Sequence, residues 1–303
     1  MVRWLLPMAL VGVHVCTATP ALIGTSRACG LQASQNCIMR LTQFAPPSGH
    51  PSGLLSPKDR RVQIKPDQFP WSAIGRINVV FGPSYRVTCT GTLIGPRQVL
   101  TAGHCLFNSR VNDWGKPQSV HFVLGQSGET FLGHSLADSF VTAPDFKFKL
   151  EDRPRYDKIS AEQVRNDWAI ITLHDAFSVK PVPIKPVQNA EFAEAASGEQ
   201  VALAGYGIDR QYVLSVHKGC AAKVDGPDRG TITHMCDSAP GESGGPILLL
   251  RDADTTLIGI QSANEQRFQP NVGYQAVVGR GVSASEFAEA AGASTPESIF
   301  RRN

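Results

Sequence analysis

The sequence predicts an all-β fold that ends in one helix, and two patterns in the 303-residue chain lead to this prediction. From Trp71 onward, short apolar runs are separated by Gly, Pro, Asn and Asp, which is typical of antiparallel β-barrels and sandwiches. Near the end, Ser283 and Glu286 form a capping-box pattern, and the run to Ala291 is closed by Gly292. This second pattern predicts a single C-terminal helix.

Short apolar runs give the expected strands. They cover residues 74–81, 87–94, 99–102, 119–124, 168–173, 201–206, 247–250, 257–262 and 273–278. Between them, Pro181, Pro183 and Pro186 lie in the stretch 178–187, and proline cannot donate to a sheet ladder. We therefore expect an extended connector there that joins two β-units.

The first 21 residues have the pattern of a secretory signal peptide. Arg3 precedes an apolar stretch over 4–15, and small residues follow around Ala18 and Ala21. The stretch is shorter than the roughly 20 apolar residues that a membrane span needs, and a proline and a histidine interrupt it. The sequence thus predicts export, with no membrane association after the leader is removed.

Residues 22–61 are rich in Pro, Gly and Ser and have little periodic apolar pattern. We interpret them as a pro-segment or N-terminal extension. The folded domain, with its C-terminal helix, is expected over residues 62–303.

Cysteine usage agrees with export, because removal of the leader takes Cys16 from seven cysteines and leaves an even set. Six cysteines permit 15 pairings, but these fall into three local couples. Nearest-neighbour pairing is the simplest prediction. The predicted bonds are Cys29–Cys37, Cys89–Cys105 and Cys220–Cys236.

Charge and histidine spacing argue against several other classes of protein. The net charge of +3 is small for this length and the basic residues form no stripe, so we expect no nucleic-acid partner. The histidines lack HExxH spacing and no cysteine cluster has zinc-finger spacing, so we expect neither a metal nor a cofactor. The charged stretch 147–158 is expected to be a solvated loop, with a calcium loop as the alternative.

Several polar residues lie where a strand or loop could hold them at a cleft. His104 follows the run 99–102, Asp167 opens DWAIITL, and Ser243 lies among glycines in GESGGP. Attack on an amide carbonyl needs a nucleophile, a base, a group that orients the base, and donors for the oxyanion. The amides of Gly241 and Ser243 could supply the donors. Taken singly, each residue also has a purely structural interpretation, as a surface histidine, a turn or a flexible loop.

The segments around these residues resemble those of trypsin-like (chymotrypsin-fold) serine peptidases, nearer the bacterial secreted branch that includes glutamyl endopeptidases. The matching segments are CTGTLIGPRQVLTAGHC, DWAIITL and CDSAPGESGGPILL, and the resemblance covers about residues 59–291. It implies two packed antiparallel six-stranded β-barrels and a C-terminal helix. It also implies that His104 is the general base, Asp167 orients it, and Ser243 attacks. Gly241 and Ser243 would form the oxyanion hole.

The same resemblance places Asp237, Ser238, Ser262 and Asn264 in or beside the substrate-binding pocket. Asp237 stands where trypsin-like members carry the carboxylate at the base of the pocket, which favours cleavage after Arg or Lys. Glutamate-specific relatives show a similar Asp-Ser or Asp-Thr pair but read the substrate with a histidine, where this chain has Gln261. Basic residues are therefore the first expectation, small or apolar residues the second, and glutamate the last.

Two departures from the family concern activation. Glu242 precedes the nucleophile, whereas activated animal members have an aspartate there that pairs with a freshly cut N-terminus, and no Ile-Val-Gly-Gly start is present. Cleavage after the dibasic pair Arg60–Arg61 would make Val62 the first residue of the mature chain. Its α-amino group could then pair with Glu242.

The sequence predicts a secreted serine endopeptidase, acting as a monomer on polypeptides through an acyl-enzyme intermediate. The alternative is a catalytically silent homologue that acts as a binding or regulatory protein. Such proteins usually lose a residue of the His-Asp-Ser triad, and this chain keeps all of them.

Overall fold

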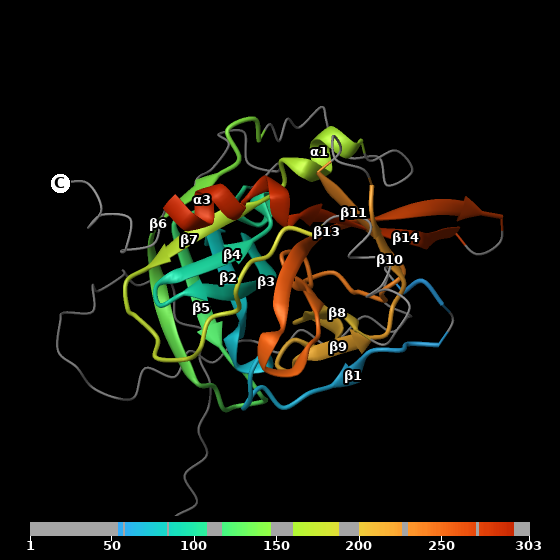
Figure 1. Ribbon diagram of the computed structural model, residues 1–303. Helices are drawn as coiled ribbons and strands as arrows, with labels where there is room; N and C mark the ends of the chain where they lie inside the picture. Colours follow the sequence, from blue (N-terminus) through green and yellow to red (C-terminus); the bar gives the residue numbers. More distant parts are fainter. Residues whose placement is uncertain are drawn as a thin grey trace, which may run out of the picture. The chain divides into compact units, whose positions relative to one another are not determined.

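The computed structural model describes residues 54–56, 58–83, 85–107, 117–146, 160–187, 200–225, 230–270 and 273–293 (Figure 1). The expected signal peptide over 1–21, the Cys29–Cys37 bond and most of the extension over 22–61 lie outside these residues, as does the charged stretch 147–158.

The first β-unit is a closed barrel of antiparallel strands in the order β2-β3-β4-β7-β6-β5. The strands are β2 (Ile74–Gly82), β3 (Tyr85–Gly95), β4 (Gln98–Thr101), β5 (Ser119–Leu124), β6 (Gly133–Thr142) and β7 (Ala169–Leu173). Large apolar side chains fill the barrel, and Ile77, Leu100, Phe122 and Ile171 are almost or fully buried. The first expected barrel is confirmed.

The second β-unit is an eight-stranded antiparallel sheet in the order β1-β9-β8-β12-β13-β14-β11-β10. Its strands are β1 (Val62–Gln63), β8 (Val201–Gly205), β9 (Ser215–Lys218), β10 (Ala222–Val224), β11 (Thr231–His234), β12 (Pro246–Leu249), β13 (Thr256–Gln269) and β14 (Gly273–Ser283). It differs from the expected six-stranded barrel because its hydrogen-bonded order does not close and β1 adds a strand beside β9. Figure 1 shows blue β1 along this edge.

Five strands of the structure were not predicted from the sequence, and their side chains explain why. In β6, Leu136 and Val141 are exposed, so the strand lacks the regular alternation of buried apolar and exposed polar residues that predicts a strand. β9, β10 and β11 are short and contain Lys, His and Thr, and β1 has two residues. These segments are therefore strands because they pair with longer neighbours, and their own apolar pattern contributes less.

The proline-rich connector is extended, as predicted, and it is bonded to both β-units. The amide of Val182 donates to Leu93 O in β3 at 2.9 Å. Lys185 N donates to Leu257 O, and Leu257 N donates to Pro183 O, which ties the same segment to β13. The connector thus links the barrel to the second sheet.

The helical elements are short. Residues in 3₁₀ geometry are Trp71–Ala73, Gly103–Leu106, Ile208–Arg210, Asp252–Asp254 and Ala284–Glu286. Helix α1 (Ala161–Arg165) was not predicted, although it begins with a capping box in which Ser160 and Gln163 bond reciprocally. Helix α3 covers Ala288–Ala293.

The expected continuous C-terminal helix is wrong in three details. Phe287 leaves helical geometry (φ −126°, ψ −5°) between the 3₁₀ turn and α3, and its fully buried ring packs edge-on against Trp168. Glu286 pairs with Arg165 at 3.1 Å and does not complete the capping box of Ser283. Gly292 lies inside α3 and does not close it. Burial of one aromatic ring has overridden the local pattern.

Two of the predicted disulfides are confirmed. Cys89–Cys105 joins β3 to the 3₁₀ turn after β4, and Cys220–Cys236 links the segments that flank β10 and β11. Across the parts of the chain that the structure describes, no helix is both long and apolar enough to cross a membrane.

Candidate active site

His104 and Asp167 are held together by two hydrogen bonds. His104 lies in the 3₁₀ turn after β4, and Asp167 lies just before β7, the strand that pairs with β4. The amide of His104 donates to Asp167 Oδ1 at 2.8 Å, and His104 Nδ1 lies 2.8 Å from Asp167 Oδ2. Because Nδ1 faces the carboxylate, the Nε2 atom of the ring remains for other partners.

Ser262 completes the surroundings of Asp167. Its hydroxyl donates to Asp167 Oδ2 at 2.5 Å from strand β13. Burial acts to raise the pKa of Asp167, but the charge and hydrogen bonds of His104 and the hydroxyl of Ser262 outweigh it and hold the pKa below its usual value. Burial acts to lower the pKa of His104, and Asp167 more than offsets it, so this pKa is raised. The second sheet thereby orients the carboxylate that His104 contacts.

The loop that carries Ser243 is bonded to the barrel next to His104. Thr90 N in β3 donates to Ser243 O at 2.9 Å, and this oxygen lies 3.9 Å from Sγ of Cys105. A Cβ on Gly244, which has φ +78°, would fall 2.6 Å from the amide nitrogen of Ala102. This close approach requires glycine. It places Ser243 beside the segment that holds His104, although no hydrogen bond joins Ser243 Oγ to His104 Nε2 within the described residues.

Within the part of the chain that the structure describes, two backbone amides of this loop have no hydrogen-bond partner. Gly241 has φ +97°, and its carbonyl turns back to accept a hydrogen bond from Thr90 Oγ1 at 3.0 Å. The amides of Gly241 and Ser243 have no hydrogen-bond partner within the described part of the chain. They lie on either side of Glu242, whose own amide donates to Ala239 O. Unpaired backbone amides are the kind of donor that can bind an oxyanion.

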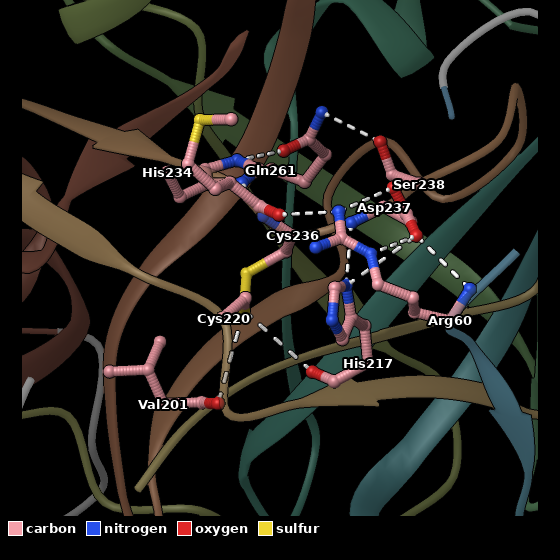
Figure 2. The surroundings of a disulfide bond; sticks show 10 residues. Arg60, Val201, His217, Cys220, His234, Cys236, Asp237, Ser238 and Gln261 are labelled. Carbon is pink, nitrogen blue, oxygen red and sulfur yellow. Dashed lines mark hydrogen bonds and ion pairs between the residues drawn. A yellow bond between two sulfur atoms is a disulfide. The ribbon is translucent and has the colours of Figure 1, made fainter. Parts of the chain in front are cut away.

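Two of the expected pocket residues, Ser238 and Asn264, form a neutral hydrogen-bond network with Gln261 and His234. Asn264 Nδ2 donates to Ser238 Oγ at 2.8 Å, and Gln261 Nε2 donates to Asn264 Oδ1 at 2.9 Å. Gln261 Oε1 lies 2.6 Å from His234 Nε2 (Figure 2). Burial lowers the pKa of His234 to about 4, so this imidazole is neutral near pH 7 and donates to Gln261. Amides and a hydroxyl therefore line this part of the site.

Asp237 is not an open carboxylate at the base of a pocket, which corrects the expectation drawn from the sequence. It is fully buried, and Arg60 forms a two-point ion pair with it, with Nε and Nη2 each 2.9 Å from a carboxylate oxygen (Figure 2). The amides of Leu55 and Arg60 also donate to it. Burial acts to raise the pKa of Asp237, but these donors hold it below its usual value. The negative charge is already neutralised within the chain.

His217 is a neutral neighbour of Asp237. Its Nδ1 accepts the amide of Asp237 at 2.7 Å, so this nitrogen carries no proton. The 3.9 Å separation from Asp237 Oδ2 is therefore not an ion pair. Burial and then the charge of Arg60 lower the pKa of His217, in agreement with a neutral ring.

Glu242 is paired with Arg61 and not with an α-amino group. Both side chains are 1% exposed, and Arg61 Nη1 lies 2.6 Å from Glu242 Oε1. In the uncleaved chain, the guanidinium of Arg61 is thus the cation that pairs with Glu242. From the sequence, the α-amino group of Val62 was expected in this role.

Arg60 and Arg61 were not identified from the sequence as the cations that pair with Asp237 and Glu242. From the sequence, the two arginines indicate only a cleavage site. A buried carboxylate needs a cation, and the glycine-rich loop that contains Asp237 and Glu242 has no basic residue. This lack is the signal in the sequence that points to an arginine pair elsewhere in the chain.

The group of possible metal ligands in the described residues, Cys89, His104 and Cys105, does not fit a metal ion. Both sulfur atoms are joined in a disulfide, so neither is a thiolate that could bind a metal.

Comparison with known proteins gives a consistent family. A family model described as Trypsin matches residues 60–279. Curated relatives include the proclotting enzyme of Tachypleus tridentatus, 25% identical over 217 residues, and melanization protease 1 of Drosophila melanogaster, 27% identical over 218 residues. The alignments cover 63% and 60% of this chain and 56% and 51% of those proteins. The chain thus spans about half the length of the curated relatives it matches.

Solved structures confirm the expected chymotrypsin-like fold. A Glu endopeptidase in complex with MPD has a TM-score of 0.57 at 19% identity, covering 79% of this chain and 100% of that chain. The protease Anisep from Arthrobacter nicotinovorans has a TM-score of 0.52 at 16% identity, covering 76% and 98%.

Thr90 gives a test of how the Ser243 loop is held. Its hydroxyl accepts the amide of Tyr206 at 2.8 Å and donates to Gly241 O, and all of these groups are buried. Thr90→Val keeps the shape but leaves a buried amide unpaired, so we expect a loss of about 1–3 kcal/mol in the free energy of unfolding. Denaturant unfolding of the purified protein measures it.

Thr92→Val is the matched control. Thr92 lies on the same strand and is equally buried, but its hydroxyl has no hydrogen-bond partner. Replacement of an unpaired buried hydroxyl by a methyl group should leave stability unchanged or raise it. Equal losses in both variants would contradict the bracing role of Thr90.

Proposed function

Because the chain belongs to the trypsin family, we propose that it is a secreted serine endopeptidase with His104, Asp167 and Ser243 as its catalytic triad. The observation that carries the proposal is the pair of hydrogen bonds between His104 and Asp167, beside a loop that presents Ser243 and two unpaired amides. The expected substrates are polypeptides. The signal-peptide pattern over 1–21 supports secretion, and no cofactor enters the mechanism.

The residues of the site have distinct tasks in this mechanism. Asp167 accepts a hydrogen bond from His104 Nδ1, which fixes the tautomer with a free Nε2. His104 Nε2 removes the proton of Ser243 as its oxygen attacks the substrate carbonyl, and the amides of Gly241 and Ser243 bind the resulting oxyanion. His104 then protonates the leaving amine. A water molecule hydrolyses the acyl-enzyme by the same route.

A catalytically silent homologue is the second candidate. It would need no free oxyanion donors and no oriented imidazole, yet the chain keeps both features. Hydrolysis of casein distinguishes the two candidates, because only the enzyme produces fragments.

The nucleophile is tested by active-site labelling. A fluorophosphonate should modify Ser243 and abolish peptide hydrolysis, because only an activated serine attacks this reagent at neutral pH. Peptide mapping locates the label. The Ser243→Ala variant should not react with the fluorophosphonate and should show no turnover, while its circular dichroism spectrum stays that of the wild type. Label on another residue, or full activity in Ser243→Ala, would refute the proposal.

The role of Asp167 predicts a shift in the pH profile. His104 must be neutral to act as a base, and Asp167 raises its pKa, so kcat/KM should rise with pH through a value above that of an ordinary histidine. In Asp167→Asn the raising cause is gone and burial lowers the pKa, so the acid limb should move to lower pH. We also expect kcat to fall by about 10⁴-fold. An unchanged acid limb would show that Asp167 does not act on His104.

The pairing of Asp237 predicts the substrate preference. A substrate arginine would meet a carboxylate that Arg60 already neutralises, so we expect small or uncharged residues to be preferred over Arg and Lys at the cleaved bond. Arg60→Met should free the carboxylate and raise kcat/KM for Arg relative to Ala substrates by about tenfold or more. Rates with Arg, Ala, Phe and Glu substrates measure this. A wild-type preference for Arg that disappears in Asp237→Ser would contradict it.

A further inference from the structure

Glu242 holds the loop that presents the two oxyanion amides. Its Oε2 accepts the amide of Ala239 at 3.1 Å, its own amide donates to Ala239 O at 3.0 Å, and its carbonyl accepts Gly245 N at 2.9 Å. The side chain therefore closes a compact turn around Gly241 and Ser243. This function requires the carboxylate to stay in place although it is 1% exposed, and a buried carboxylate is costly without a cation.

Arg61 supplies that cation in a fixed geometry. All three guanidinium nitrogens have acidic partners: Nη1 lies 2.6 Å from Glu242, Nη2 lies 2.6 Å from Asp209, and Nε lies 3.0 Å from Asp59. Arg210 in turn pairs with Asp59 at 2.6 Å and donates to the carbonyl of Arg61 at 3.3 Å, and within the described residues it has no hydrogen bond or ion pair with Glu242. A guanidinium with every nitrogen engaged cannot rotate, so it holds the Glu242 carboxylate in one place.

The chain on both sides of Arg61 is bonded to the second sheet. Arg60 pairs with Asp237, while Val62 and Gln63 form β1 and pair with Val216 and Ser215 of β9. The peptide bond between Arg61 and Val62 thus joins the buried ion pair to a strand. Val62 is 52% exposed, whereas Arg61 and Glu242 are buried.

We propose that Arg61 is a positioning residue that orders the oxyanion loop through Glu242, so that the protein is active with the Arg61–Val62 peptide bond intact. The inference rests on the proposed serine endopeptidase function. The internal guanidinium takes the part that a newly cut α-amino group would otherwise play. Cleavage after Arg61 would separate this guanidinium from β1 and is not required for activity.

Ionisation of the pair agrees with this role. Burial raises the pKa of Glu242 to about 7, and the charge of Arg61 opposes the rise. Without Arg61, the carboxyl group would be more fully protonated at neutral pH and would have no fixed partner. The loop would then lose the group that orders it.

The first test requires no variant. The wild-type protein is labelled with a fluorophosphonate, and the labelled molecules are digested and mapped. We expect labelled molecules that contain the peptide spanning Arg61–Val62. If every labelled molecule begins at Val62, the inference is wrong while the proposed function stands. If no molecule is labelled and no peptide is hydrolysed, the proposed function itself fails.

The second test separates positioning from folding. Arg61→Met removes the cation at similar length, and we expect kcat to fall by about 10²–10³-fold, the effect of losing oxyanion donors, with a smaller change in KM. Arg61→Lys should recover part of kcat, because an ammonium at this site still pairs with Glu242 but lacks the fixed geometry of the guanidinium. The matched control Arg210→Met removes a cation from the same cluster and should change kcat by no more than about threefold.

These outcomes have different meanings. A folded Arg61→Met variant with wild-type kcat would overturn the inference, as would equal losses in Arg61→Met and Arg210→Met. Circular dichroism and thermal unfolding report whether each variant folds. If Arg61→Met does not fold, Arg61→Lys and the mapping of labelled wild-type protein still decide the matter.

Discussion

The structure around Ser243 depends on the ion pair between Arg61 and Glu242, a buried carboxylate one residue before Ser243. Glu242 can order the loop only while its carboxyl group is fixed, and water cannot reach this group to stabilise its charge. The chain solves this with Arg61, which is itself buried among acidic partners. The strand β1, the paired Asp237 and the ordered loop are consequences of bringing this N-terminal segment against the second sheet.

The two β-units meet through Thr90, which is bonded to the loop that carries Ser243 and lies beside Cys89, the disulfide partner of Cys105. Thr90 N and Oγ1 bond the loop at Ser243 and Gly241, while the neighbouring Cys89 is joined to Cys105, next to His104. The Ser262 hydroxyl crosses in the other direction, from the second sheet to Asp167. Groups from separate sheets are thereby kept in register by short, buried contacts, which is the precision that acyl transfer requires.

Prediction from the sequence succeeded where the signal is local. The strand over 119–124, the Cys89–Cys105 bond and the meeting of His104 with Asp167 all follow from short segments with strong patterns. It did not find the partners of Asp237 and Glu242, because each lies more than 170 positions away in sequence and nothing near the loop specifies which upstream arginine reaches it. The broken C-terminal helix has the same cause, since burial of Phe287 against Trp168 is a tertiary contact.

The acyl-enzyme is the species that tests this account most directly. An activated ester such as p-nitrophenyl acetate is mixed with the wild-type protein, the reaction is quenched in acid within the first turnover, and tandem mass spectrometry locates the acyl group. We expect a burst of product equal to the enzyme present and an acyl group on Ser243, held there as the intermediate of the His104–Asp167 mechanism. Peptide hydrolysis without a trapped acyl group, or an acyl group on any other residue, would contradict it.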